Sequence, residues 1–207
     1  MIGGVITEFN LPTGNSAPWG IAAGPAADGA LWFTENSRNR IGRITTAGVV
    51  TNEFTILTAN SAPRGIALGP DSALWFVENA GNKIGRITTG GAITEFTIPT
   101  ANRQPSGIAT GPDGNLWFTE NAGNNIGRIT TDGLNVNEFT VPTANGQPWS
   151  IAAGPDGALW FTEINGNKIG RLTTLTLGLS SLLQERAQSH MPLKPVERLP
   201  SRSPWQQ

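Results

Sequence analysis

Four glutamates recur along the chain, each at the end of a short Trp-Phe-Thr-Glu or Trp-Phe-Val-Glu segment. They are Glu35, Glu78, Glu120 and Glu163, and they are spaced by 43, 42 and 43 residues. Carboxylate oxygens are the ligands that hard divalent cations prefer, so this row is a candidate metal site, and Glu120 and Glu163 are candidates for a catalytic base. In the alternative interpretation, each glutamate accepts backbone N–H groups or pairs with an arginine that recurs with it (Arg43, Arg86, Arg128 and Arg171). Because a catalytic group is needed only once, recurrence favours the structural interpretation.

A second set of candidates follows the proline that opens each Gly-Ile-Ala or Ser-Ile-Ala segment. These positions hold Trp19, Arg64, Ser106 and Trp149, and they differ although their surroundings repeat. Two indole rings and a guanidinium could hold a planar or anionic ligand. The alternative is that these side chains are neutral filling.

Composition argues against several classes of function. The chain has no cysteine, a formal net charge of −1 and a single histidine, His190, which lies outside the repeats and is not expected to be catalytic. The charge balance argues against a nucleic-acid partner. No run reaches the roughly 20 apolar residues of a membrane span, and the N-terminus has no signal-peptide pattern, so we expect a soluble cytoplasmic protein. The aspartates Asp28, Asp71, Asp113 and Asp156 are expected to cap turns and not to bind calcium.

The repeat predicts the elements that must position these residues. A period just above 40 residues with several short strand-like runs is typical of a β-propeller, one four-stranded blade per period. In the third period we expect strands over 106–110, 115–121, 125–131 and 136–141. Apolar residues on both faces of 115–121 indicate that neighbouring blades cover both faces. The predicted fold is therefore all-β, with blade units 14–56, 57–98, 99–141 and 142–174 in a repeat domain over 1–174.

The two ends of this domain suggest how the ring is closed. Residues 5–11 resemble the last strand of each period, and the fourth period ends at Thr174 with only three strands. We therefore expect the N-terminal strand to complete the last blade, which gives four blades and sixteen strands. Residues 175–207 follow no repeat and are expected to be irregular or partly helical, with a short helix near 180–188. They are interpreted either as sequence foreign to the propeller or as a natural linker or docking tail.

The linked motifs resemble a known repeat. Pro-x-Gly-Ile-Ala-x-Gly-Pro-Asp-Gly-x-Leu-Trp-Phe-Thr-Glu-Asn, followed by Ile-Gly-Arg-Ile-Thr and Ile-Thr-Glu-Phe-x-Ile-Pro-Thr, is similar to the repeat of the streptogramin B lyases (virginiamycin B lyase family) over residues 2–174. The resemblance implies a seven-bladed propeller that linearises cyclic depsipeptide antibiotics by elimination at an ester, with Mg²⁺ and a histidine as general base or acid. It also implies that the metal carboxylate is the glutamate of Trp-Phe-Thr-Glu. The implied histidine position is the one that follows the strand-opening proline, and no repeat has histidine there.

Three hypotheses follow. The first is a lyase-like propeller that is catalytically silent and acts as a scaffold or binding module. The second is an active Mg²⁺-dependent carbon–oxygen lyase acting on a depsipeptide, and the third is a propeller that binds a small molecule or glycan through Trp19 and Trp149. Seven blades turn about 51° each, whereas four would need about 90°. We therefore expect an eight-bladed homodimer or an open arc in preference to a closed four-bladed monomer.

Overall fold

The computed structural model describes residues 3–174, and all regular structure in this range is β-strand. The expectations for residues 175–207, including the helix near 180–188 and the position of His190, lie outside the described residues. No helix in the described part of the chain is long and apolar enough to span a membrane.

Fifteen strands form four antiparallel sheets, each a simple meander. The first sheet contains β1 (Pro18–Ala23), β2 (Ala30–Glu35), β3 (Arg40–Thr45) and β4 (Val50–Thr55). The second contains β5 (Pro63–Leu68), β6 (Leu74–Glu78), β7 (Lys83–Ile87) and β8 (Ile93–Thr97). The third contains β9 (Pro105–Thr110), β10 (Leu116–Glu120), β11 (Asn125–Ile129) and β12 (Val136–Thr140), and the fourth contains β13 (Pro148–Ala153), β14 (Ala158–Glu163) and β15 (Lys168–Thr173).

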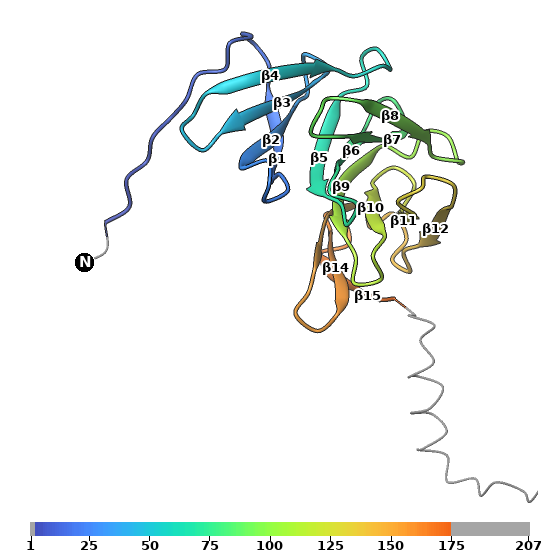
Figure 1. Ribbon diagram of the computed structural model, residues 1–207. Coiled ribbons are helices and arrows are strands. Elements are labelled where there is room, and N and C mark those ends of the chain that lie inside the picture. The colour runs from blue at the N-terminus through green and yellow to red at the C-terminus, as the bar shows by residue number, and fades with distance from the viewer. Residues whose placement is uncertain (1–2, 175–207) are drawn as a thin grey trace, which may run out of the picture. The chain divides into compact units, whose positions relative to one another are not determined.

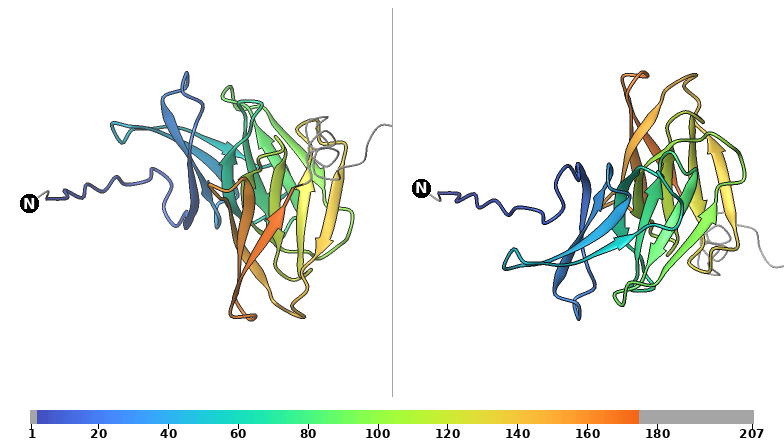
Figure 2. Two further views of the ribbon diagram at one scale, coloured as in Figure 1. Left: turned by 90° about the horizontal axis from the view of Figure 1, so that it is seen from below. Right: turned by 90° about the horizontal axis from the view of Figure 1, so that it is seen from above.

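The sheets are successive propeller blades. Their first strands contact one another in the order β1, β5, β9 and β13, and the remaining strands of each blade extend outward from this inner row (Figure 1). Viewed from above and below, the sheets lie side by side (Figure 2). The predicted all-β propeller is therefore confirmed, and the four strands of the third period lie within two residues of their predicted bounds.

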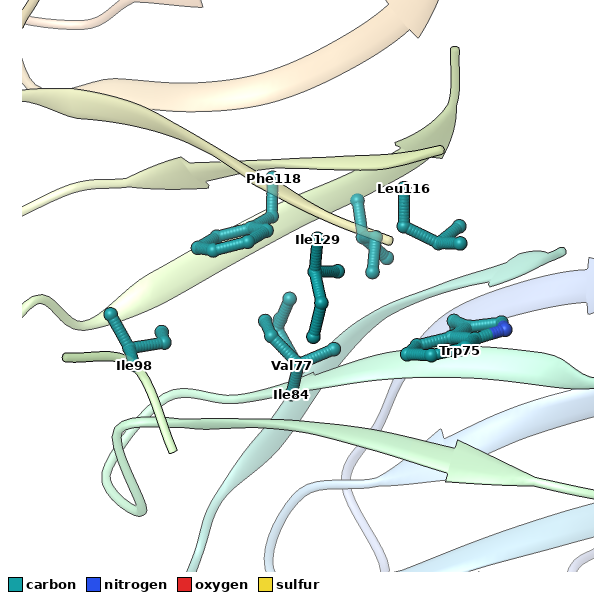
Figure 3. Packing of buried hydrophobic residues seen from close by; sticks show 8 residues of the cluster. Trp75, Val77, Ile84, Ile98, Leu116, Phe118 and Ile129 are labelled. Atoms are coloured by element: carbon teal, nitrogen blue, oxygen red, sulfur yellow. The ribbon is translucent and has the colours of Figure 1, made fainter. Parts of the chain in front are cut away.

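Aromatic side chains pack within and between blades. In the third sheet the ring of Phe118 lies over Gly127, where an added Cβ would come within 2.2 Å of the ring. Between the second and third sheets an apolar cluster fills the interface (Figure 3). Its buried members are Trp75, Val77, Ile84 and Ile98 from one sheet, and Ile108, Leu116, Phe118 and Ile129 from the other. Strand β10 is buried along its whole length, so both of its faces are covered, as predicted.

The prediction that the N-terminal strand closes the ring is wrong. Residues 5–11 form no strand, Val5 and Ile6 are more than 90% exposed, and the fourth sheet has three strands among the described residues. The ring of Phe9 instead lies over Gly48 in the first sheet, just as the ring of Phe54 lies over Gly91 in the second. The segment therefore lies where the outer strand of a preceding blade would lie. Its sequence has the pattern of an outer strand, but this pattern does not specify the sheet edge with which the segment would pair.

Candidate ligand-binding site on the inner strands

Three of the four variable positions come together. Arg64 of β5 places its Cζ 5.0 Å from the ring centroid of Trp19 on β1 and 5.1 Å from that of Trp149 on β13. The two indole centroids are 6.3 Å apart and the rings are inclined by 48°. One guanidinium thus contacts two aromatic rings that come from the first and last blades.

The backbone around this cluster explains its position. Each variable residue is followed by a small residue, and an added Cβ on Gly20 would lie 2.5 Å from the carbonyl oxygen of Arg64. The inner strands can therefore approach closely, which aligns their second residues. Threonine hydroxyls of the preceding blade fix the carbonyls of this row: Thr34 Oγ1 donates to the Arg64 oxygen at 2.7 Å, and Thr119 Oγ1 donates to the Trp149 oxygen at 2.8 Å.

The guanidinium of Arg64 keeps unused hydrogen-bonding capacity. Burial lowers the pKa of Arg64, although an arginine starts so high that it stays charged at neutral pH. Its Nε is buried and has no hydrogen-bond partner among the described residues. Trp19 is 52% exposed, so one face of the cluster is open to solvent. Ser106, the fourth candidate, is buried in the same row of inner strands.

The four recurring glutamates end the second strands, where each lies opposite the proline that precedes a variable position, and all are buried. Burial, reinforced by the nearby charges of Glu95 and Glu138, raises the pKa of Glu78 and of Glu120 to about 8. The pKa of Glu35 is also raised, by burial and by the charge of Glu53. The carboxylate oxygens of Glu35, Glu78 and Glu120 accept no hydrogen bond in the described structure.

This arrangement does not fit a divalent cation. Within residues 3–174, no three histidine, cysteine, aspartate or glutamate side chains group closely enough to hold a metal ion. The magnesium site that the repeat suggested stays a prediction.

The recurring arginines pair with aspartates and not with the glutamates, which corrects one of the two sequence interpretations. The pairs are Arg43–Asp28 at 2.7 Å, Arg86–Asp71 at 2.7 Å, Arg128–Asp113 at 3.0 Å and Arg171–Asp156 at 2.9 Å. In each blade the same aspartate also accepts the indole N–H of the buried or half-buried tryptophan four residues later. The fixed spacings of 4 and 15 residues were visible in the sequence, but only the paired strands show that they converge.

A second set of ion pairs was not predicted. The outer-strand glutamate of the first sheet, Glu53, pairs with Arg40 at 2.8 Å, and in the second sheet Glu95 pairs with Lys83 at 2.7 Å. These pairs link the third and fourth strands of a blade.

The fold is that of a β-propeller, and its inner strands bring Trp19, Arg64 and Trp149 together. The profile of the virginiamycin B lyase family matches residues 1–190, and the chain belongs to that family.

Solved structures agree with this assignment. A catalytically inactive histidine-to-alanine variant of virginiamycin B lyase from Staphylococcus aureus, with quinupristin, shares 53% sequence identity and a TM-score of 0.78. That match covers 83% of this chain and 57% of the other. A streptogramin B lyase structure shares 42% identity with a TM-score of 0.73, covering 84% and 60% of the two chains. Virginiamycin B lyase from Bacillus licheniformis is 48% identical over 43 residues, which is 21% of this chain and 14% of that protein. The chain thus spans less than two thirds of the length of these relatives.

Proposed function

We propose that this chain is a ligand-binding propeller of the virginiamycin B lyase family that does not itself catalyse elimination. The observation that supports the proposal best is Arg64, held between Trp19 and Trp149 with an unpaired Nε. Indole faces stack on planar rings, and a guanidinium donates to carbonyl or carboxylate oxygens. Aromatic rings and ester and amide carbonyls in one compact ring are the chemistry of a streptogramin B depsipeptide, which is the ligand class we assign to this cluster.

The proposed lack of turnover follows from the residues present. Removing a proton next to an ester carbonyl needs a base within hydrogen-bond reach of that proton. The positions that the family resemblance gives to histidine hold Trp19, Arg64, Ser106 and Trp149. In the Staphylococcus aureus protein, a histidine-to-alanine variant is inactive and is nevertheless found with quinupristin. Binding without catalysis is therefore consistent with this family.

The lyase alternative rests on Glu120, whose pKa of about 8 suits a general base near neutral pH. However, Glu120 is fully buried and Glu163 is only 6% exposed, so neither reaches solvent beside the Trp–Arg–Trp cluster. We therefore prefer the binding function.

Tryptophan fluorescence tests the proposal. Titration with quinupristin should quench emission saturably in the parent chain, and Trp19→Ala or Arg64→Ala should weaken binding at least tenfold. Arg128→Ala is the matched control, because Arg128 also lies over an indole, that of Trp117, at 5.9 Å but outside the cluster. It should bind as the parent does. Equal affinity in all four proteins would contradict the proposal. Quenching by a neutral oligosaccharide that survives Arg64→Ala would favour the glycan alternative.

A further inference from the structure

The last described sheet has an open edge at β15, whereas residues 5–11 carry an outer-strand sequence that pairs with no sheet in the described chain. Val5-Ile-Thr-Glu-Phe differs from Ala92-Ile-Thr-Glu-Phe, which includes most of strand β8, at one position. An unpaired row of backbone N–H and C=O groups is a template for a further strand. The open edge of β15 lacks an outer strand, and residues 5–11 have the sequence of an outer strand without a sheet.

The β15 edge and the N-terminal segment also carry opposite charges at equivalent positions. In the second sheet, Lys83 Nζ contacts both Glu95 at 2.7 Å and Thr58 Oγ1 at 2.6 Å. In the fourth sheet, Lys168 Nζ contacts the corresponding Thr143 Oγ1 at 2.9 Å. Glu163 lies opposite it on β14, but no outer-strand glutamate forms an ion pair with it among residues 3–174. The glutamate at the equivalent position of the unpaired segment is Glu8. Lys168 and Glu8 are therefore two halves of an ion pair that the first and second blades complete.

An asparagine in the hairpin before β15 is a third feature that matches the N-terminal segment. Asn124 Nδ2 donates to the carbonyl oxygens of Val141 and Thr143, at 3.1 and 2.9 Å, just beyond the outer strand. Asn167 stands at the same corner with the same left-handed backbone, φ 50°, without those acceptors in the described part of the chain. In the unpaired segment the equivalent carbonyls belong to Leu11 and Thr13.

The faces of the two end blades are uncovered in a complementary way. On the last sheet Trp160 and Ile169 are 39% and 63% exposed, whereas Trp117 and Ile126, their counterparts in the third sheet, are 3% and 1% exposed. On the first sheet Ile21 is 64% exposed, against 7% for Ile66. Between neighbouring blades the equivalent faces pack together: Trp117 and Ile126 of the third sheet belong to one buried cluster with Ile151 of the fourth. Trp32 and Ile41 of the first sheet likewise cluster with Ile66 of the second. Apolar surface of this extent favours association with a matching face.

We propose that the occupant of the β15 edge is residues 5–11 of a second copy of this chain, so that two chains close head to tail into an eight-bladed ring. The register of β7 with β8 predicts that Ile169 lies opposite the partner's Phe9 and Gly170 lies opposite the partner's Glu8. The segment cannot reach β15 of its own chain in this arrangement, because Phe9 lies over Gly48 beside the first sheet. It already occupies the place of a preceding blade's outer strand, which is where the partner's last blade would lie.

One residue makes this junction different from the two junctions among the first three blades. Asn36 and Asn79 donate to the proline carbonyls of the next blade, at 3.0 Å in both cases, and the corresponding residue of the last blade is Ile164. Ile164 is 53% exposed. The interface between two copies would therefore lack this asparagine hydrogen bond and would bury the apolar side chain of Ile164 instead.

Light scattering on the full chain tests the dimer, with no ligand present. The expected mass is twice the 21.8 kDa of one chain. Glu8→Lys and Lys168→Glu should each raise the dimer dissociation constant at least tenfold, and the double variant should restore the parent value. Asn10→Thr is the control, since its counterparts Thr55, Thr97 and Thr140 are exposed threonines; it should leave the dimer unchanged.

Circular dichroism of each variant establishes that the β-structure is retained. A parent mass of 21.8 kDa over the micromolar range, or a dimer that neither charge reversal weakens, would overturn the proposal.

Discussion

Trp117 Nε1 donates a hydrogen bond to Asp113 at 2.9 Å, and Arg128 binds the other oxygen of the same carboxylate at 3.0 Å. The aspartate lies in the turn between β9 and β10, the tryptophan on β10 and the arginine on β11. One carboxylate therefore ties a turn to two neighbouring strands, and every blade repeats the arrangement. Burial alone would raise the pKa of Asp113, but hydrogen bonds from Trp117, Asn115 and Arg128 outweigh it and hold the pKa below its ordinary value.

Replacing this carboxylate should destabilise the propeller. Asp113→Asn removes a charge-assisted hydrogen bond to Arg128, and we expect it to lower the free energy of unfolding by about 2 kcal/mol. Urea denaturation at pH 7 measures the change. Asp156→Asn is the matched control, because Asp156 and Arg171 are more exposed, with side chains 38% and 43% accessible. A loss at Asp156 as large as that at Asp113 would contradict the argument from burial.

The buried glutamates predict a pH dependence of opposite sign. The pKa of a glutamate in the unfolded chain is near 4.5, whereas the pKa of Glu120 in the folded chain is about 8. Between these two values the folded chain retains a proton that the unfolded chain has lost. Stability is therefore fully present below about pH 4.5 and falls as the pH rises to about 8. Glu120→Gln should remove part of this fall and raise the unfolding free energy at pH 8.5 by on the order of 2 kcal/mol.

Thermal unfolding of both proteins between pH 3 and 9 measures this effect. Asp113→Asn provides a contrast, since the lowered pKa of Asp113 gives stability that is present above its unfolded pKa and is lost as the pH falls. Parallel pH profiles for the parent and Glu120→Gln would refute the proposed protonation of Glu120.

The contact of Phe118 with Gly127 predicts a steric effect. Gly127→Ala places a methyl group 2.2 Å from the Phe118 ring, inside a fully buried layer, and should cost about 3 kcal/mol of stability. Gly90→Ala is the control, because the nearest atom to its added Cβ is 3.8 Å away, and it should be neutral or slightly stabilising. Denaturation midpoints that are equal for the two variants would show that the ring moves aside without cost.

The sequence predicted the repeat architecture well because turn residues and strand patterns recur with it. The bounds of β9 to β12 followed from one period of Gly-Pro-Asp-Gly turns and apolar runs. That residues 5–11 pair with no sheet of the described chain could not be predicted, because an outer-strand sequence fits the edge of any blade.

The site was predictable only in part. The positions of Trp19, Arg64 and Trp149 were identified by their variation inside a regular repeat, but their distances depend on how far each blade is rotated from the next. The suggested pairing of arginine with glutamate was wrong because of strand register. Trp117 lies opposite Arg128, whereas Glu120 lies opposite Asn125, three positions along the ladder, so the arginine and the glutamate are on opposite faces.

The most direct test of the proposed function is to incubate the chain with quinupristin and Mg²⁺ and to separate the products by reversed-phase chromatography. Chromatography is needed because an elimination that opens the ring leaves the mass of the depsipeptide unchanged. We predict that quinupristin quenches the tryptophan emission saturably and is recovered intact. A linear product that forms in proportion to the protein and disappears with a chelator would contradict the account.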